Sequence, residues 1–365
     1  MEQKNMDITK ERDKMELSKL QQKIIDAPSN KSVVLSAAAS GKTALLTEKV
    51  RQVLRAGVDP RQIAVVTFTN MAASEMRQRL GEDLKDGLFI GTIHALANYM
   101  LSVGGISTRK VLDDEKFEKL FEMIEDNPTC VRHMEWVFLD EAQDSDKSQF
   151  KFLFDMIKPD FFFVVGDPRQ SIYQWKDGDP TLMIDLSKEP GVQLFDMNEN
   201  YRNGRNILDF ARRILYPIGM EDSSIPMRPI SGTVSQQEYS GHAIVNLISG
   251  QGKPGDWAVL TRTNQEISTV SVFLKKAEIP FDTFKQADLS REELTKRMEA
   301  DTVKVLTIHS SKGLAFDNVI VVGARFHPDD ERNVCYVAAT RARNKLVWMS
   351  YAKKKKGPTK VRGWD

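Results

Sequence analysis

The run from Val33 to Thr43 constrains the fold of this chain more than any other stretch. It begins with apolar, largely β-branched residues, continues with small residues, and ends in Gly41-Lys42-Thr43. Apolar residues then recur at helical spacing from 45 to 54. This pattern predicts a strand, a tight loop and a helix N-terminus, an arrangement whose backbone N–H groups suit a phosphate anion. Lys42 adds a positive charge, and the hydroxyl of Thr43 is a candidate ligand for Mg²⁺.

The predicted phosphate loop departs from the strict glycine-rich pattern. Ser36 stands five positions before Gly41, where glycine is usual, and Ala37 and Ala39 occupy two further positions that are often glycine. Small side chains still permit close approach of a ligand, but alanine adopts positive φ angles less readily than glycine. The loop assignment therefore depends on its strand and helix context.

Composition restricts the class of protein. The chain has 365 residues, enough for two domains, and 41% of them are hydrophobic. The 52 basic residues nearly balance the 51 acidic ones, so no net charge would attract the whole chain to nucleic acid. Any nucleic-acid site must therefore be a local groove. Two cysteines make no disulfide framework, the N-terminus is too charged for a signal peptide, and no apolar run could span a membrane. We therefore expect a cytoplasmic protein without membrane contact.

Polar residues follow several apolar strands at the point where each strand ends. Thr67-Phe68-Thr69, Asp140-Glu141 and Gly166-Asp167 each come directly after such a run. Continuous apolar strands that alternate with helices predict a parallel sheet covered on both faces. Ligands bind beyond the carboxyl ends of the strands in sheets of this kind, so these residues should meet the phosphate loop.

The chain divides into two expected α/β domains, 1–190 and 191–365. The first carries a small helical insertion at about 97–133. The second opens with a strand at 192–195, has a connection rich in proline, serine and glycine at 217–235, and lacks a phosphate loop. Further strands are expected at 257–260, 302–306, 319–322 and 346–349, with helices at 205–216, 266–277 and 331–341.

Three groups of residues carry candidate chemistry. Asp140 and Glu141 are suited to hold Mg²⁺ and to orient or deprotonate water, although a lone pair of this kind is often an ordinary acidic loop. Gln170 is placed to sense a terminal phosphate. Tyr173 and Trp175 alternate with polar residues, which suits base stacking and equally suits a core position.

Two arginines of the expected second domain, Arg202 and Arg341, are candidates to stabilise a transferred phosphoryl group from across a cleft. Such contacts would make hydrolysis sensitive to the distance between the domains. The simpler alternative for either arginine is a surface salt bridge.

These motifs resemble, in matching order from Gln21 to Arg341, those of superfamily-1 helicases of the UvrD/Rep/PcrA type. The segments that carry the resemblance are Gln21, Ala39–Thr43, Val66–Met76, Gly91–His94, Asp140–Asp144, Gly166–Tyr173, Asn200–Arg202, Leu306–Leu314 and Tyr336–Ala342. The resemblance implies two RecA-like domains with an ATP cleft between them. It also implies ATP-dependent movement along single-stranded DNA in the 3′–5′ direction, with duplex unwinding.

The resemblance also implies a role for each matching residue. At the base of the nucleotide, Gln21 reads adenine and Tyr201 stacks on it. The nucleotide is also bound by Ala39, Ser40, Gly41, Lys42 and Gly313, while Thr43 and Asp140 hold Mg²⁺. Glu141 is the catalytic base, and the γ-phosphate is contacted by Gln170, Arg202 and Arg341, of which Arg341 is the arginine finger. Along the single strand lie Phe68, Asn70, His94, Tyr173, Trp175, Arg262 and His309. The implied partners are single-stranded DNA, junctions of single-stranded and duplex DNA, and replication or repair proteins; the implied active form is a monomer.

Two departures from the family pattern leave alternatives open. Ala315 stands where relatives usually carry a glutamate, and the chain is about half as long as family members because large insertions are missing. An ATP-gated module that binds single-stranded DNA or remodels nucleoprotein without processive unwinding is therefore the alternative function. A P-loop kinase or GTPase-like switch explains neither Arg202 and Arg341 nor the second domain. RNA stays open as a track, and the run Lys353–Lys356 is either a solvated tail or a phosphate contact.

Overall fold

The computed structural model describes residues 17–173, 177–284, 289–323 and 331–351. Trp175 and the Lys353–Lys356 run lie outside these residues. Backbone contacts divide the chain into two units. Unit 1 comprises the chain up to Arg202 together with Gly219–Arg228, and unit 2 comprises Asn203–Ile218 and the chain from Pro229 onward. The chain therefore passes from one unit to the other after Arg202, after Ile218 and after Arg228.

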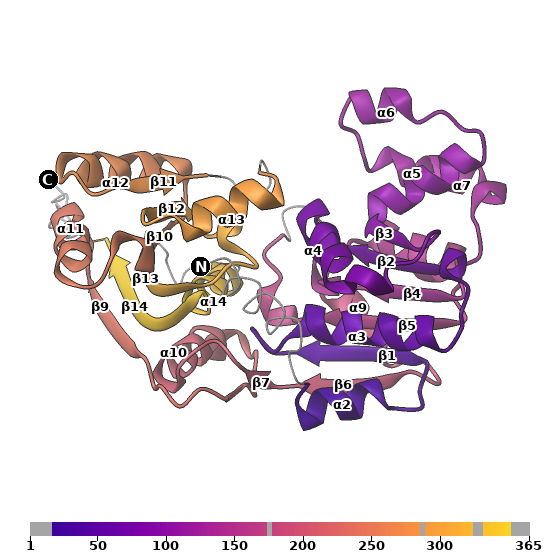
Figure 1. Cartoon of the computed structure of the whole chain (residues 1–365), viewed down its shortest axis with the longest axis horizontal. Helices are drawn as coiled ribbons and strands as arrows, with labels where there is room; N and C mark the ends of the chain where they lie inside the picture. The colour runs from indigo at the N-terminus through magenta and orange to yellow at the C-terminus, as the bar shows by residue number, and fades with distance from the viewer. Residues whose placement is uncertain (1–16, 174–176, 285–288, 324–330, 352–365) are drawn as a thin grey trace, which may run out of the picture. The chain divides into compact units, whose positions relative to one another are not determined.

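Unit 1 is built on a parallel sheet with the strand order β3-β2-β4-β5-β1-β6 (Figure 1). Its strands are β1 (Lys31–Ser36), β2 (Ile63–Thr67), β3 (Phe89–Thr92), β4 (Trp136–Leu139), β5 (Phe161–Gly166) and β6 (Gln193–Met197). Every residue of β2 and β4 is buried, as the continuous apolar runs predicted. Since all pairings are parallel, the carboxyl ends of the strands lie along one edge of the sheet.

Helices cover both faces of this sheet. Helices α2 (Lys19–Ile25), α3 (Lys42–Arg55) and α4 (Asn70–Leu80) pack on the face that carries Val34, Val65 and Phe138. The opposite face is covered by α5 (Ile93–Val103), α7 (Lys119–Asp126), α8 (Lys147–Phe150) with the π-helical turn Lys151–Met156, and α9 (Thr181–Leu186). Successive side chains of a strand thus pack into cores on opposite faces of the sheet, so both faces must carry apolar side chains.

The insertion predicted at about 97–133 begins within α5 and contains α6 (Arg109–Asp113), α7 and the 3-10 helix Pro128–Cys130, which lie between α5 and β4. Leu120, Phe121 and Ile124 of α7 belong to the same core cluster as α5. Figure 1 shows α6 at the outer end of this layer. The insertion therefore extends the covered face of the sheet and adds no strand to it.

The start of the expected second domain belongs to unit 1. Strand β6 pairs with β1, with Leu194 opposite Val33, and unit 1 continues to Arg202, so the predicted boundary at 190/191 falls too early. Within the predicted connection 217–235, β8 (Ile225–Pro226) pairs with β7 (Glu199–Asn200), which also lies in unit 1. An apolar run predicts a strand but does not encode which sheet the strand joins, so the pattern at 192–195 did not reveal this pairing.

Unit 2 is a second parallel sheet, with the order β11-β12-β10-β13-β14-β9. Its strands are β9 (Thr233–Glu238), β10 (Trp257–Thr261), β11 (Phe281–Thr283), β12 (Val303–Thr307), β13 (Phe316–Val322) and β14 (Ala342–Ser350), and its helices are α10 (Arg205–Leu215), α11 (Gly241–Gly250), α12 (Asn264–Lys276), α13 (Arg291–Glu299) and α14 (Arg332–Ala339). The predicted α/β class is confirmed. Strands β9 and β11 and helices α11 and α13 were not predicted.

The core of unit 2 also has two sides. Ile244 of α11 and Leu274 of α12 pack with Val347 of β14, whereas the next residue, Trp348, lies against Phe210 of α10 at 5.3 Å between ring centroids. Alternate residues of β14 therefore serve opposite faces, as in a sheet that is covered on both sides.

Among the described residues, no helix combines the length and the hydrophobicity that crossing a membrane requires.

Candidate nucleotide site

The loop after β1 is held by its carbonyl groups. The carbonyls of three successive residues each accept a hydrogen bond: Ala38 from Asn200 Nδ2 at 2.8 Å, Ala39 from Tyr201 N at 3.1 Å, and Ser40 from Gln21 Nε2 at 2.9 Å. In a planar trans peptide, the N–H group points opposite to the carbonyl. The N–H groups that follow these carbonyls are therefore turned away from their anchors, as an anion-binding loop requires.

Two residues of this loop adopt left-handed backbone angles. Gly41 has φ +87°, and a Cβ atom there would lie 2.8 Å from Gln21 Nε2. Ala39 has φ +56°, although its side chain disfavours this region by about 1–2 kcal/mol. The loop thus takes the expected conformation despite the alanine, and the surrounding hydrogen bonds offset the strain.

Helix α3 begins at Lys42 and brings its first residues to the carboxylates that follow β4. Lys42 Nζ lies 3.3 Å from Glu141 Oε1, and Thr43 Oγ1 donates to Asp140 Oδ2 at 3.2 Å. Glu141 N in turn donates to Asp140 Oδ1 at 2.9 Å, with Glu141 at φ +54°. The structure therefore brings together the four residues that the sequence placed at the phosphates and Mg²⁺.

The charges in this cluster are not balanced. Burial and the neighbouring Glu141 raise the pKa of Asp140 to about 7, against the opposing influence of Lys42. Burial lowers the pKa of Lys42, but the carboxylates of Glu141, Asp167 and Asp140 outweigh it, so this pKa lies above its usual value. Because Asp167 is paired with Arg169, one buried lysine faces the two adjacent carboxylates of Asp140 and Glu141, and an added cation would relieve their repulsion.

The oxygen atoms of Thr43 and Asp140 fit Mg²⁺. A hydroxyl and a carboxylate are hard oxygen ligands, and Mg²⁺ commonly takes one or two protein carboxylates together with phosphate oxygens and water. Burial and the neighbouring Glu141 disfavour the charged form of Asp140, which a bound cation would favour. These two residues would hold the ion beside the phosphate loop.

A chain of hydrogen bonds joins the proposed base to the proposed phosphate sensor. Gln143 Nε2 donates to Glu141 Oε2, and Gln143 Oε1 accepts from Asp167 N at 2.8 Å. Asp167 Oδ2 accepts from Gln170 Nε2 at 2.7 Å. Gln143 is fully buried, so its amide fixes the spacing between the ends of β4 and β5. No separate role was predicted for Gln143 beside Asp140-Glu141.

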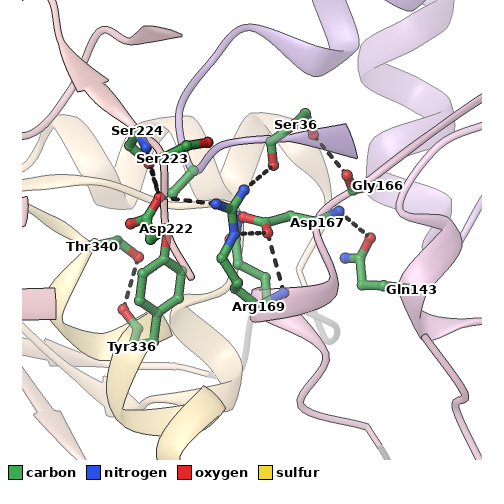
Figure 2. Close-up of polar contacts among 12 residues, drawn as sticks. Ser36, Gln143, Gly166, Asp167, Arg169, Asp222, Ser223, Ser224, Tyr336 and Thr340 are labelled. Atoms are coloured by element: carbon green, nitrogen blue, oxygen red, sulfur yellow. Dashed lines mark hydrogen bonds and ion pairs between the residues drawn. The ribbon is translucent and has the colours of Figure 1, made fainter. Parts of the chain in front are cut away.

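Arg169, which follows Asp167 in the turn Pro168–Gln170, is a site residue that sequence reasoning missed. Its guanidinium contacts Asp167, the Ser36 carbonyl and Asp222, as Figure 2 shows. Asp222 lies 53 positions further along the chain, within the stretch that resembled a connection. No periodic signal marks such a pair, because it depends on tertiary contact.

Of the predicted adenine-binding residues, Gln21 lies at the start of α2 and Tyr201 follows β7. Ser18 N donates to Gln21 Oε1 at 2.9 Å, while Gln21 Nε2 donates to the Ser40 carbonyl. Tyr201 is 43% exposed, and its hydroxyl donates to Glu199 at 2.8 Å. A fixed amide thus lies beside the phosphate loop, which also contacts the exposed aromatic residue through the Ala39 carbonyl.

The predicted track residues of unit 1 follow the carboxyl ends of β2, β3 and β5. Phe68 and Tyr173 stack on each other, with ring centroids 4.9 Å apart. His94 lies against Phe121 of the insertion at 5.1 Å, and Asn70 is exposed at the first position of α4. Trp175 is outside the described residues, so its predicted role is not addressed.

Arg202 belongs to unit 1, not to the second domain as predicted. Its N–H donates to Asn200 Oδ1 at 3.0 Å, and its carbonyl accepts from Arg228 at 2.8 Å. The misplaced boundary has the same cause as for β6, since the sequence did not show that β7 joins unit 1. A phosphate contact from Arg202 would therefore come from within unit 1.

The remaining predicted residues lie in unit 2. Arg341 is 2% exposed, and its guanidinium donates to the carbonyls of Val337 and Leu314 and to the Thr340 hydroxyl. Arg262 forms an ion pair with Glu331 at 2.5 Å. His309 and Gly313, the latter at φ +85°, flank the turn after β12. The roles of these residues in nucleotide or DNA binding stay predictions.

Comparison with known families addresses the identity of the whole arrangement. The model of the UvrD/REP helicase N-terminal domain matches residues 17–129 and 107–191, and that of the UvrD-like helicase C-terminal domain matches residues 284–354. The chain belongs to the UvrD-like helicase family. Its two parallel α/β units are accordingly RecA-like, as the resemblance implied.

Several curated proteins are similar to this UvrD-like chain. ATP-dependent DNA helicase Rep of Salmonella typhimurium is 24% identical over 372 residues, covering 73% of this chain and 55% of the relative. ATP-dependent DNA helicase PcrA of Bacillus subtilis is 22% identical, with 73% and 50% covered. A probable DNA helicase of Mycoplasma pneumoniae is 24% identical, with 92% and 83% covered. The chain spans about half the length of Rep and PcrA.

Proposed function

We propose that this chain hydrolyses ATP to move along single-stranded DNA, most simply as a 3′–5′ helicase that unwinds duplex DNA. The observation that carries the proposal is the cluster of Lys42, Thr43, Asp140 and Glu141 at the N-terminus of α3. Similarity to proteins named ATP-dependent DNA helicases supports DNA as the track.

The side chains of the cluster divide the work of hydrolysis. Lys42 neutralises charge on the β- and γ-phosphates, and bound Mg²⁺ supplies further charge stabilisation. Thr43 and Asp140 would hold that ion. Glu141 accepts a proton from the attacking water. Lys42 lies 3.3 Å from Glu141 and exchanges this partner for phosphate when ATP binds.

Adenine recognition follows from the fixed amide of Gln21. Ser18 N–H can only donate and the Ser40 carbonyl can only accept, so the amide cannot flip. One N–H and one oxygen lone pair of Gln21 are left for a ligand. This pattern matches the acceptor N7 and the amino donor of adenine; guanine presents two acceptors at the same edge.

Single-stranded DNA would be bound by stacking at Phe68 and Tyr173. These rings follow β2 and β5 at the edge of the sheet that carries the nucleotide site. Stacking tolerates any base sequence, as a translocase needs. Phe68 and Tyr173 now contact each other, so a base must separate them or stack on an outer face.

An ATP-gated binding or remodelling module without processive unwinding is the second candidate function. The observation that favours it is the small size of the insertion in unit 1, where only α6, α7 and the short 3-10 helix Pro128–Cys130 are described between α5 and β4. Such a module would hydrolyse ATP on single-stranded DNA but would not separate strands.

Strand displacement on duplexes with 3′ or 5′ tails, measured beside ATP turnover, tests both functions. The helicase proposal predicts DNA-stimulated turnover and displacement of the duplex with a 3′ tail. Stimulated turnover without displacement supports the second function, and turnover that ignores single-stranded DNA contradicts both. A single-stranded RNA of the same sequence tests whether the track is specific for DNA, and Lys42→Ala is the inactive control.

A further inference from the structure

Arg169 lies at the centre of a buried cluster that joins three segments of unit 1 (Figure 2). Its Nε donates to Asp167 Oδ1 at 2.6 Å, one terminal nitrogen donates to the Ser36 carbonyl at 3.0 Å, and the other donates to Asp222 Oδ1 at 2.9 Å. The side chain of Arg169 is 9% exposed, and those of both aspartates are 0% exposed. Removing one partner of such a buried ion pair leaves an uncompensated charge.

Asp222 reaches this cluster from an unusual segment of the chain. Residues 219–228 belong to unit 1, whereas the residues on both sides of them belong to unit 2. The segment is fixed at its other end as well, because Met227 N donates to the Asn200 carbonyl at 2.9 Å. Asn200 itself holds the Ala38 carbonyl of the phosphate loop. Both ends of the segment therefore contact elements that shape the nucleotide site.

Asp167 connects Arg169 to the proposed phosphate sensor. Its Oδ1 accepts from Arg169, and its Oδ2 accepts from Gln170 at 2.7 Å. When Gln170 turns toward a γ-phosphate, Asp167 loses the hydrogen bond from Gln170 Nε2. The Asp167 carboxylate then interacts more strongly with the Arg169 guanidinium. A change in the contact between Asp167 and Arg169 alters how strongly Arg169 binds Asp222, because both aspartates share one guanidinium.

We propose that Arg169 and Asp222 are a positioning pair that ties segment 219–228 to the γ-phosphate end of the nucleotide site. The pair orients Asp167 for Gln170 and makes the conformation of the segment depend on the bound nucleotide. Because the segment continues into unit 2 at both ends, the pair links nucleotide state to the connections between the units. This inference rests on the proposed function, since it takes Gln170 as the phosphate sensor.

Asp222→Asn tests the pair, with Glu221→Gln as its matched control. Both variants exchange a carboxylate for an amide at adjacent positions of one segment, but Glu221 is exposed. Steady-state ATP turnover on single-stranded DNA should show kcat lowered on the order of tenfold in Asp222→Asn, with KM for ATP changed less than about twofold. Glu221→Gln should match the wild type. Combining Asp222→Asn with Arg169→Gln should cost little more than Arg169→Gln alone.

Hydrogen exchange of segment 219–228 gives a second readout that does not depend on turnover. In the wild type, a non-hydrolysable ATP analogue with Mg²⁺ should alter exchange in this segment; in Asp222→Asn the alteration should be lost, and in Glu221→Gln it should remain. Unchanged exchange in the wild type with the analogue shown to be bound overturns the inference, as does equal behaviour of the two variants. A wild-type protein that neither binds nor hydrolyses ATP overturns the proposed function, and the inference with it.

Discussion

Gln21 donates from Nε2 to the carbonyl oxygen of Ser40 across 2.9 Å. A residue proposed to read the base therefore also holds the loop proposed to bind the phosphates. Both partners are 6% exposed or less, so the contact is shielded from water. Base recognition and loop conformation are coupled through one side chain.

Gln21→Ala should weaken ATP binding and reduce the preference for ATP over GTP. The substitution removes both the fixed amide and the support of the Ser40 carbonyl, so KM for ATP should rise on the order of tenfold. The matched control is Gln22→Ala, an exposed neighbour whose amide contacts Asp26. Competition between ATP and GTP in a turnover assay measures the preference, and an unaltered ratio would remove the adenine assignment.

Glu141→Gln should abolish turnover while keeping nucleotide bound. The amide preserves the shape of the side chain but cannot accept the proton of the attacking water, and the loss should be at least about 10²-fold in kcat. Lys42→Ala should lose turnover and nucleotide affinity together. Fluorescent-nucleotide titration separates the two effects; a fully active Glu141→Gln would exclude this residue as the base.

Binding of Mg²⁺ with nucleotide should weaken as the pH falls below about 7. The pKa of Asp140 is raised to about 7 because burial and Glu141 disfavour its charge, and only the ionised form holds the metal. Below this pH, protons compete with Mg²⁺ for Asp140, so the affinity for Mg²⁺ should fall by about tenfold per pH unit; above this pH it should be constant. Asp140→Asn is the control measured at each pH. It lacks the titrating carboxylate, so its remaining pH dependence reports the titration of the nucleotide itself. A parallel pH dependence in both proteins would contradict the assignment.

The two left-handed residues of the phosphate loop should differ in their response to exchange between glycine and alanine. Gly41→Ala places a Cβ 2.8 Å from Gln21 Nε2 at φ +87°, so it should impair both stability and ATP binding. Ala39→Gly relieves strain at φ +56° but adds about 0.4–1 kcal/mol of unfolded-state entropy, so its stability should change little. Urea unfolding measures the free energies, and a strongly destabilised Ala39→Gly would show that its Cβ is required.

Tyr173→Ala should weaken binding of single-stranded DNA by about 1–3 kcal/mol if the ring stacks on a base. Its present partner is Phe68, so the substitution also frees that ring. Exposed Tyr216 in unit 2 provides a control aromatic position outside the predicted track. Fluorescence anisotropy with a labelled oligonucleotide measures the loss. Equal affinity of Tyr173→Ala and the wild type would assign the Phe68–Tyr173 pair to packing alone.

Much of unit 1 was predictable because its signals are local. The apolar runs of β1, β4 and β5 and the polar residues that end them are contiguous in the sequence, and parallel pairing places those ends at one edge. The meeting of Lys42 with Glu141 and of Thr43 with Asp140 follows from that rule. Resemblance added Gln21, whose importance no local pattern reveals.

The parts that the sequence did not reveal depend on long-range contact. Asp222 looks like a residue of any polar connection, and only the folded chain shows it buried against Arg169. The pairing of β6 with β1 was missed for the same reason, since Leu194 and Val33 are far apart in the chain. Short strands such as β11, with partly exposed residues, give too weak a pattern to be recognised.

The return of residues 219–228 to unit 1 means that no single cut can divide this chain into two intact halves. A fragment that stops at Arg202 would keep Arg169 but lose Asp222. The buried Arg169 guanidinium would then lack one of its two carboxylate partners. A fragment that starts at Asn203 would carry a stretch whose strand partner β7 is gone. Expressed apart, each half should be less stable than within the whole, and mixing the two should restore stability through fragment complementation.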